Sequence, residues 1–174
     1  MSTLDETLSG IQIPPDIKNT LSLLEVDYFS FEGDTLRGHL VVHKELHNEL
    51  KDIFKKLREI KFPINKIIPV VAYNWSDEKS MEDNNTHAFN YRTILGTTKL
   101  SNHSFGRAVD INPQQNPYIV DNKVFPNGAV RNLNAPGTFA EGNDAVKIFT
   151  DRDWIWGGVW ENPKDWHHFE KPQK

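Results

Sequence analysis

The chain has 174 residues, of which 37% are hydrophobic and 25% are charged, and its formal net charge is −4. This length suits one domain with a sizeable core, and the composition is that of a globular protein rather than a disordered one. A negative net charge gives no basic footprint for nucleic acid, so we expect no nucleic-acid partner. The lack of cysteine excludes thiol catalysis and cysteine-based zinc sites, so any metal site must use histidine and carboxylate.

Hydrophobic spacing in the first half of the chain predicts a hairpin, one helix and a further strand. The expected elements are strands over 23–31 and 36–42, a helix over 44–60 and a strand over 67–72. The turn signal at Gly33 joins the first two strands, and Pro63 ends the helix. The polar stretch 77–86 predicts a loop.

The second half is expected to hold short strands between long loops. The expected elements are a strand over 108–112, a loop-rich stretch over 121–138, a short helix over 141–150 and a strand over 166–170. Strands and helices do not alternate regularly, which favours an α+β fold with a small antiparallel sheet flanked by helices. We expect residues 1–35 to form an arm that packs on a single globular unit spanning residues 36–174.

The N-terminal residues show neither the basic nor the apolar region of a signal peptide. No run reaches the roughly 18 apolar residues that a membrane helix needs. We therefore expect no membrane segment, and no pattern in the chain indicates a protein partner.

Two short segments far apart in the sequence carry most of the chemistry. They are Ser101-Asn102-His103-Ser104-Phe105-Gly106-Arg107-Ala108-Val109-Asp110 and Asp165-Trp166-His167-His168-Phe169-Glu170. Together they offer two imidazoles and a carboxylate for one metal ion, with a spare carboxylate that could act as a base. Three protein ligands with a vacant fourth position are typical of a catalytic zinc site rather than a structural one.

Strand alternation indicates how these segments could face a metal ion. If the residues around Asp110 form a strand, its carboxylate faces a cleft while its apolar neighbours face the core. Gly106 permits a tight bend, so that His103 can fold back towards Asp110. In the second segment the same alternation groups Trp166, His168 and Glu170 on one face, and Asp165, at the entry of the strand, is free to turn in beside them.

These residues resemble the metallopeptidases of the hedgehog/DD-peptidase group, which includes D-alanyl-D-alanine carboxypeptidases and L-alanyl-D-glutamate endopeptidases. That family carries Ser-x-His-x-x-Gly-x-Ala-x-Asp followed by Asp-or-Glu-x-x-His, and both patterns are complete here. Further matches are Phe89-Asn90-Tyr91-Arg92, Asp110-Ile111-Asn112-Pro113, Asn116-Pro117-Tyr118 and Trp156-Gly157-Gly158 with Trp160. The resemblance covers roughly residues 36 to 171.

The resemblance implies a zinc-dependent peptidase that acts on the stem peptides of bacterial peptidoglycan, as a carboxypeptidase or as an endopeptidase. The implied site consists of the zinc ligands His103, Asp110 and His168, the general base Asp165, and Arg92, which contacts the substrate and the developing oxyanion. Ser101 and Glu170 are candidates for residues that hydrogen-bond to the metal ligands and thereby orient them. Such an enzyme would work at the cell wall or on recycled cytoplasmic muropeptides.

The alternative is a zinc-stabilised binding domain of the same fold without catalysis. The hedgehog signalling domains share this fold and illustrate that a metal site can persist in a binding protein. Asp165 favours the enzyme, because a purely structural metal site needs no base.

Other aromatic and histidine residues near these motifs are not expected to bind the metal ion or a sugar. His167 competes with His168, but strand alternation points it away and the family spacing selects His168. His87 is expected in a solvent-exposed loop. The tryptophans near the C-terminus are expected to pack the core and the cleft wall rather than to bind sugars, with one of them shaping the substrate groove.

Overall fold

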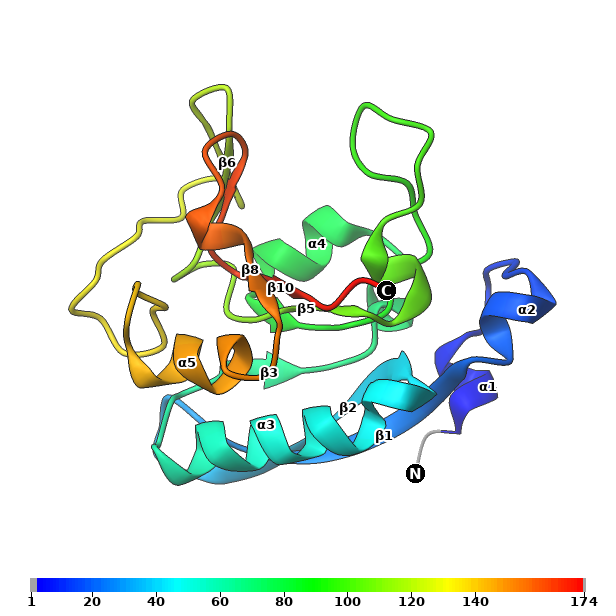
Figure 1. Ribbon diagram of the computed structural model, residues 1–174, viewed down its shortest axis with the longest axis horizontal. Helices are drawn as coiled ribbons and strands as arrows, with labels where there is room; N and C mark the ends of the chain where they lie inside the picture. Colours follow the sequence, from blue (N-terminus) through cyan, green and yellow to red (C-terminus); the bar gives the residue numbers. More distant parts are fainter. Residues whose placement is uncertain (1–2, 174) are drawn as a thin grey trace.

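A long hairpin and one helix form the base of the molecule in the computed structural model, which describes residues 3–173 (Figure 1). Strands β1 (Leu21–Phe29) and β2 (Thr35–His43) pair antiparallel over their whole length. Helix α3 (His47–Glu59) follows and packs along β1. The hairpin and the helix are therefore confirmed close to their expected bounds.

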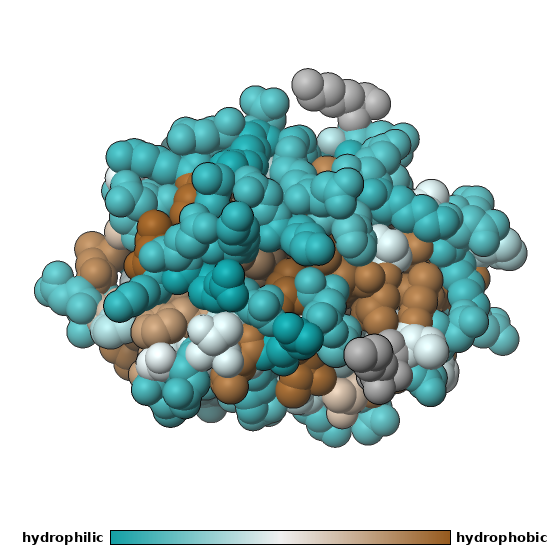
Figure 2. All heavy atoms as spheres, turned by 90° about the horizontal axis from the view of Figure 1, so that it is seen from below, coloured by the Kyte–Doolittle hydropathy of each residue, from teal (hydrophilic) through white to brown (hydrophobic). Residues whose placement is uncertain are grey.

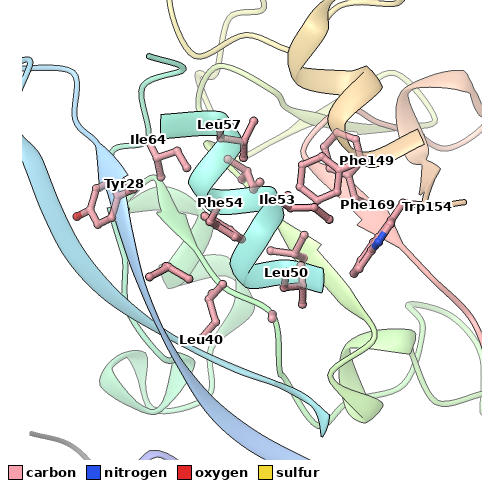
Figure 3. Close-up of a cluster of buried hydrophobic side chains, with 14 of the residues drawn as sticks. Tyr28, Leu40, Leu50, Ile53, Phe54, Leu57, Ile64, Phe149, Trp154 and Phe169 are labelled. Carbon is pink, nitrogen blue, oxygen red and sulfur yellow. The ribbon is translucent and has the colours of Figure 1, made fainter. Parts of the chain in front are cut away.

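The main core lies around α3, whose apolar residues recur at helical spacing and all face inward. These are Leu50, Ile53, Phe54 and Leu57, each with no exposed surface. Figure 3 shows them between Leu40 of the hairpin on one side and Phe149 and Phe169 on the other. The rings of Phe149, from α5 (Asp144–Thr150), and Phe169 stack with centroids 4.0 Å apart. Each such buried side chain contributes about 1.5–3 kcal/mol, so this cluster anchors the C-terminal segment to the base.

A small antiparallel sheet at the centre of the molecule joins the two motif segments. Its strands run in the order β5 (Ala108–Asp110), β10 (His168–Glu170) and β8 (Ile155–Trp156). Val109 faces Phe169 in the register, and both have no exposed surface. Because side chains alternate along a strand, Asp110 and His168 must point to the opposite face. Core packing thus sets the register that pairs the two motifs.

The remaining elements are short and complete an α+β architecture, as expected. A second sheet has the order β7 (Lys123–Phe125), β6 (Tyr118–Val120) and β9 (Lys164–Asp165), while β3 (Lys66–Ile67) and β4 (Asn85–Thr86) form a parallel pair. The short helices are α1 (Leu4–Thr7), α2 (Pro15–Lys18) and α4 (Asp77–Glu82), with 3-10 turns η1 (Lys44–Leu46), η2 (Val70–Tyr73), η3 (Asn102–Phe105) and η4 (Gly157–Val159).

Two expectations for the middle of the chain are wrong. The strand expected over 67–72 is limited to β3, because Pro69 lacks a backbone N–H for pairing and the chain turns into η2. The loop expected over 77–86 contains α4 and β4. Ser76 caps α4 by accepting a hydrogen bond from the backbone N–H of Lys79 at 3.2 Å. The polar composition of this stretch does not reveal that a helix begins here.

Residues at the N-terminal end pack on a second, smaller cluster that includes Leu8, Ile17 and Phe89. The boundary expected at residue 35 falls at the hairpin turn, and β1 contributes Leu24 and Val26 to the main core. The division into an arm and a body stays a prediction.

The face seen from below is largely hydrophilic, with apolar side chains scattered among the polar ones (Figure 2). Within residues 3–173, no helix has the length and apolar character that a membrane crossing demands.

Candidate metal centre and active site

The side chains of His87, Asp110 and His168 lie in a row on one face of the central sheet, with His87 bridged to its edge. Asp110 exchanges two backbone hydrogen bonds with His87, at 3.1 and 2.9 Å, and on its other side pairs with His168 of β10. Residues directly opposite each other in antiparallel strands point the same way. The carboxylate of Asp110 therefore lies between two imidazoles.

His103 reaches this row from the turn η3. The Ser101 hydroxyl begins η3 by accepting a hydrogen bond from the backbone N–H of His103 at 3.3 Å. Gly106 ends it with a φ of 63°, and a Cβ there would lie 2.6 Å from the backbone nitrogen of His43. Only glycine suits both conditions. The chain thus folds back as Gly106 predicts, and His103 Nε2 lies 3.1 Å from Asp110 Oδ2.

Donor atoms of three side chains lie close together, and Asp110 faces His103 through Oδ2 and His168 through Oδ1. His103 Nε2 and His168 Nδ1 are 3.1 Å apart, and His168 Nδ1 is 2.9 Å from Asp110 Oδ1. Ligands about 2.0–2.1 Å from a tetrahedral zinc ion stand about 3.3 Å from one another. The three groups are therefore spaced within a few tenths of an ångström of what zinc requires, and their chemistry suits it.

The outer nitrogens of both imidazoles have fixed partners, so their tautomers are defined. His103 Nδ1 donates to the carbonyl oxygen of Ala88 at 2.6 Å, which leaves Nε2 free as a ligand atom. Glu170 Oε2 lies 3.0 Å from His168 Nε2 and also accepts a hydrogen bond from Asn102 at 2.8 Å. Glu170 therefore holds the His168 ring with Nδ1 facing Asp110. Such carboxylate and carbonyl partners are characteristic of metal-bound histidines.

The electrostatics favour an ionised Asp110. Burial raises the pKa of its carboxyl, but the neighbouring His103 and His167 hold that pKa well below its usual range. Burial lowers the pKa of His168, yet its hydrogen bonds with Asp110 and Glu170 raise it to about 10 in the metal-free protein. The cluster thus combines an ionised carboxylate with an imidazole whose proton a metal ion would displace.

Asp165 stands beside this cluster on β9, with only 14% of its side chain exposed. Its Oδ1 lies 3.0 Å from His167 Nε2 but has no aligned hydrogen-bond donor. Burial raises the pKa of Asp165, and the nearby carboxylates of Asp110 and Asp77 add to the effect. A carboxyl whose pKa is shifted towards neutrality is suited to proton transfer.

Two histidines lie closer to the site than expected. His167 does not point away: its Nε2 is 3.9 Å from Asp110 Oδ2, because β10 begins only at His168 and alternation does not extend to the preceding residue. His87 is not exposed in a loop but is only 1% exposed, and its Nε2 lies 3.8 Å from Asp110 Oδ2. His87, His103 and Asp110 each place a potential ligand atom within 4.8 Å of the others.

Sequence reasoning missed His87 because its pairing with Asp110 is an isolated bridge outside any regular strand. The one available signal is its position two residues before the Phe89-Asn90-Tyr91-Arg92 match.

Arg92 lies beside the site with its backbone fixed to η3. Its N–H donates to Ser104 Oγ at 2.9 Å, and its carbonyl oxygen accepts from the Ser101 N–H at 3.0 Å. The guanidinium Nη2 lies 2.9 Å from Asp77 Oδ2, while the buried Nε has no hydrogen-bond partner.

Two of the C-terminal tryptophans pack in the core, as expected, and one lies beside His168. Trp154 and Trp156 are each 3% exposed and belong to the main core. The Trp160 ring is half-buried and lies 5.4 Å from the imidazole of His168. The segment 93–100 and the β6–β7 hairpin rise on opposite sides of the central sheet (Figure 1).

Comparison with known proteins agrees with the motifs. Residues 95–171, somewhat less than half of the chain, match a family model described as D-alanyl-D-alanine carboxypeptidase. Searches of curated proteins and of solved structures found no match. The matched segment contains η3, β5, β9 and β10, and therefore His103, Asp110, Asp165 and His168, whereas Arg92 precedes it.

The sequence motifs, the converging donor atoms and the match all lie in the same part of the chain. This part is folded around the central sheet and includes the buried carboxylate and both imidazoles. Over residues 95–171 the chain is therefore similar to the D-alanyl-D-alanine carboxypeptidase family.

Proposed function

We propose that the protein is a zinc-dependent hydrolase of peptide bonds in the stem peptides of bacterial peptidoglycan. The observation that carries this proposal is the convergence of His103 Nε2, Asp110 and His168 Nδ1 beside the buried carboxylate of Asp165. The description of the matched family supports peptides that end in D-alanyl-D-alanine as the substrate class.

In this proposal His103, Asp110 and His168 hold the zinc ion. His87 is the competing third ligand, but its Nε2 is 3.8 Å from Asp110 Oδ2, farther than the 2.9–3.1 Å that separate the other donor atoms. The outer nitrogen of His168 is also held by a carboxylate, as metal ligands usually are. When bound, zinc polarises the substrate carbonyl and lowers the pKa of a coordinated water to about 7.

Asp165 is the proposed general base. It takes a proton from the water as the new carbon–oxygen bond forms, and it returns that proton to the amine nitrogen as the carbon–nitrogen bond breaks. The raised pKa of Asp165 suits both transfers, because an acid–base group works best when its pKa lies near the working pH. His167 Nε2 lies 3.0 Å from its Oδ1.

Arg92 is the proposed substrate-contacting cation. Its fixed charge would stabilise the developing oxyanion, an effect typically worth about 3–4 kcal/mol. The same guanidinium would serve equally to anchor the free carboxylate of a substrate C-terminus. The first role suits an endopeptidase and the second a carboxypeptidase.

The second candidate function is a non-catalytic, zinc-stabilised binding domain. The observation that favours it is the buried His87, which has an unpartnered Nε2 close to the metal-binding face. A small movement would let it occupy the fourth position, and zinc sites with four protein ligands are structural.

Mass spectrometry of defined muropeptides separates these functions. The zinc-loaded protein is incubated with a panel of stem peptides, beside a sample treated with a chelator. Loss of a terminal D-alanine establishes a carboxypeptidase, and cleavage between L-alanine and D-glutamate establishes an endopeptidase. No zinc-dependent change of mass across the panel would contradict the proposed peptidase and favour the binding domain.

A further inference from the structure

Asp77, the first residue of α4, contacts three side chains of the segment 87–92, which leads into the site. Its Oδ2 pairs with Arg92 Nη2 at 2.9 Å, and its Oδ1 accepts a hydrogen bond from Asn90 Nδ2 at 3.3 Å. The same Oδ1 lies 3.4 Å from His87 Nε2. One carboxylate therefore contacts three residues spaced along a segment that has no regular strand of its own.

The charge of Asp77 is held firmly in this position. Burial raises the pKa of its carboxyl, but His87 and Arg92 together bring that pKa well below its ordinary value. Asp77 therefore stays ionised at neutral pH. An ionised partner restricts the guanidinium far more than a neutral one would, because charge-assisted pairs are shorter and stronger.

The contact with Asp77 holds Arg92 beside the site. The backbone of Arg92 is bound to Ser101 and Ser104 of the turn that carries His103. The guanidinium is thus held between α4 and the segment that supplies a candidate metal ligand.

We propose that Asp77 is a positioning residue that holds the guanidinium of Arg92 towards the substrate. This inference rests on the proposed peptidase function and adds to it a group that touches neither metal nor substrate. Through His87, whose Nε2 lies between Asp77 Oδ1 and Asp110 Oδ2, the same carboxylate also borders the metal-binding row.

A double-mutant cycle tests the coupling. Asp77→Asn should lower kcat/KM about 10- to 100-fold, the usual cost of a misplaced positioning group. It should act on the same parameter, kcat or KM, that Arg92→Ala changes. The double variant should be no slower than Arg92→Ala alone, since residues that act through one another are not additive. Additive losses, or a loss in the other parameter, would overturn the proposal.

Matched controls exclude a general effect on α4. Asp83→Asn removes an ion pair at the other end of the same helix, where Asp83 contacts Lys66 Nζ at 2.8 Å and the Tyr73 hydroxyl at 2.6 Å. This variant should keep wild-type kcat/KM. Asp77→Glu keeps the charge and should recover part of the activity, and it serves in the cycle if Asp77→Asn does not fold. A Glu variant no better than the Asn variant would argue against a role of the charge.

A readout independent of turnover separates this inference from the proposed function. If the wild-type protein hydrolyses no stem peptide, the proposed function fails, but the Arg92 Nε–H signal in nitrogen-15 NMR spectra still reports the pairing. In zinc-loaded Asp77→Asn this signal should shift and exchange faster with water, at unchanged zinc content. A signal identical to that of the wild type would show that Asp77 does not position Arg92.

Discussion

Replacing Asp165 with Asn tests the proposed base while changing the shape of the site very little. The side chain is almost enclosed, and the amide oxygen can still face His167 Nε2, which lies 3.0 Å from Oδ1 in the native protein. Because burial raises the pKa of Asp165, its charge opposes folding at neutral pH. The neutral variant should therefore be at least as stable as the wild type at pH 7.

The expected loss of activity follows from the other carboxylates of the site, which all have other partners. Asp110 contacts both imidazoles, Glu170 holds His168 and Asp77 pairs with Arg92. None of them is free to replace the base. General base catalysis typically contributes about 10²- to 10⁴-fold. The variant should thus lose this factor in kcat, or about 3–5 kcal/mol of transition-state stabilisation.

The assay combines turnover of a stem peptide, followed by chromatography, with zinc content measured by mass spectrometry of the metal. Asp144→Asn, at the exposed start of α5, provides the same chemical change away from the site and should be fully active. Asp165→Asn should keep one zinc ion per chain. Full activity of this variant would remove Asp165 from the mechanism, and loss of zinc would make it a ligand instead.

Three further predictions concern the metal. His168→Ala should abolish stoichiometric zinc binding whereas His87→Ala should keep it, and a dye-competition assay with the reverse result would make His87 the ligand. Glu170→Gln should weaken zinc binding about 10- to 100-fold, because it loses the carboxylate that orients His168; unchanged affinity in the same assay would exclude this role. Since the pKa of His168 is about 10 in the metal-free protein, zinc must displace a proton below that pH. Apparent affinity should therefore rise with pH, and calorimetry in two buffers should detect proton release; its absence would contradict the assigned ligand.

The hairpin, α3 and the face on which Asp110 lies could be predicted from the sequence because strong local patterns define them. Leu50, Ile53 and Leu57 recur at helical spacing, and Val109 and Phe169 sit at alternating positions whose burial leaves Asp110 on the other face. In each case the hydrophobic pattern and the tertiary structure agree.

The errors concern residues whose positions depend on distant parts of the chain. His87 is buried because it pairs with Asp110, and nothing in its local sequence indicates that bridge. His167 lies just outside β10, so strand alternation does not determine the direction of its side chain. The helix that begins at Asp77 depends on a single capping contact within a polar stretch. Its role beside Arg92 could emerge only from the folded chain.

The most direct test of the central claim is anomalous diffraction at the zinc edge from crystals of the zinc-loaded protein. We predict one zinc ion, bound by His103 Nε2, Asp110 and His168 Nδ1, with its fourth position open towards Asp165. A zinc ion bound by His87 in place of His168, or enclosed by four protein ligands, would contradict a catalytic centre of this design.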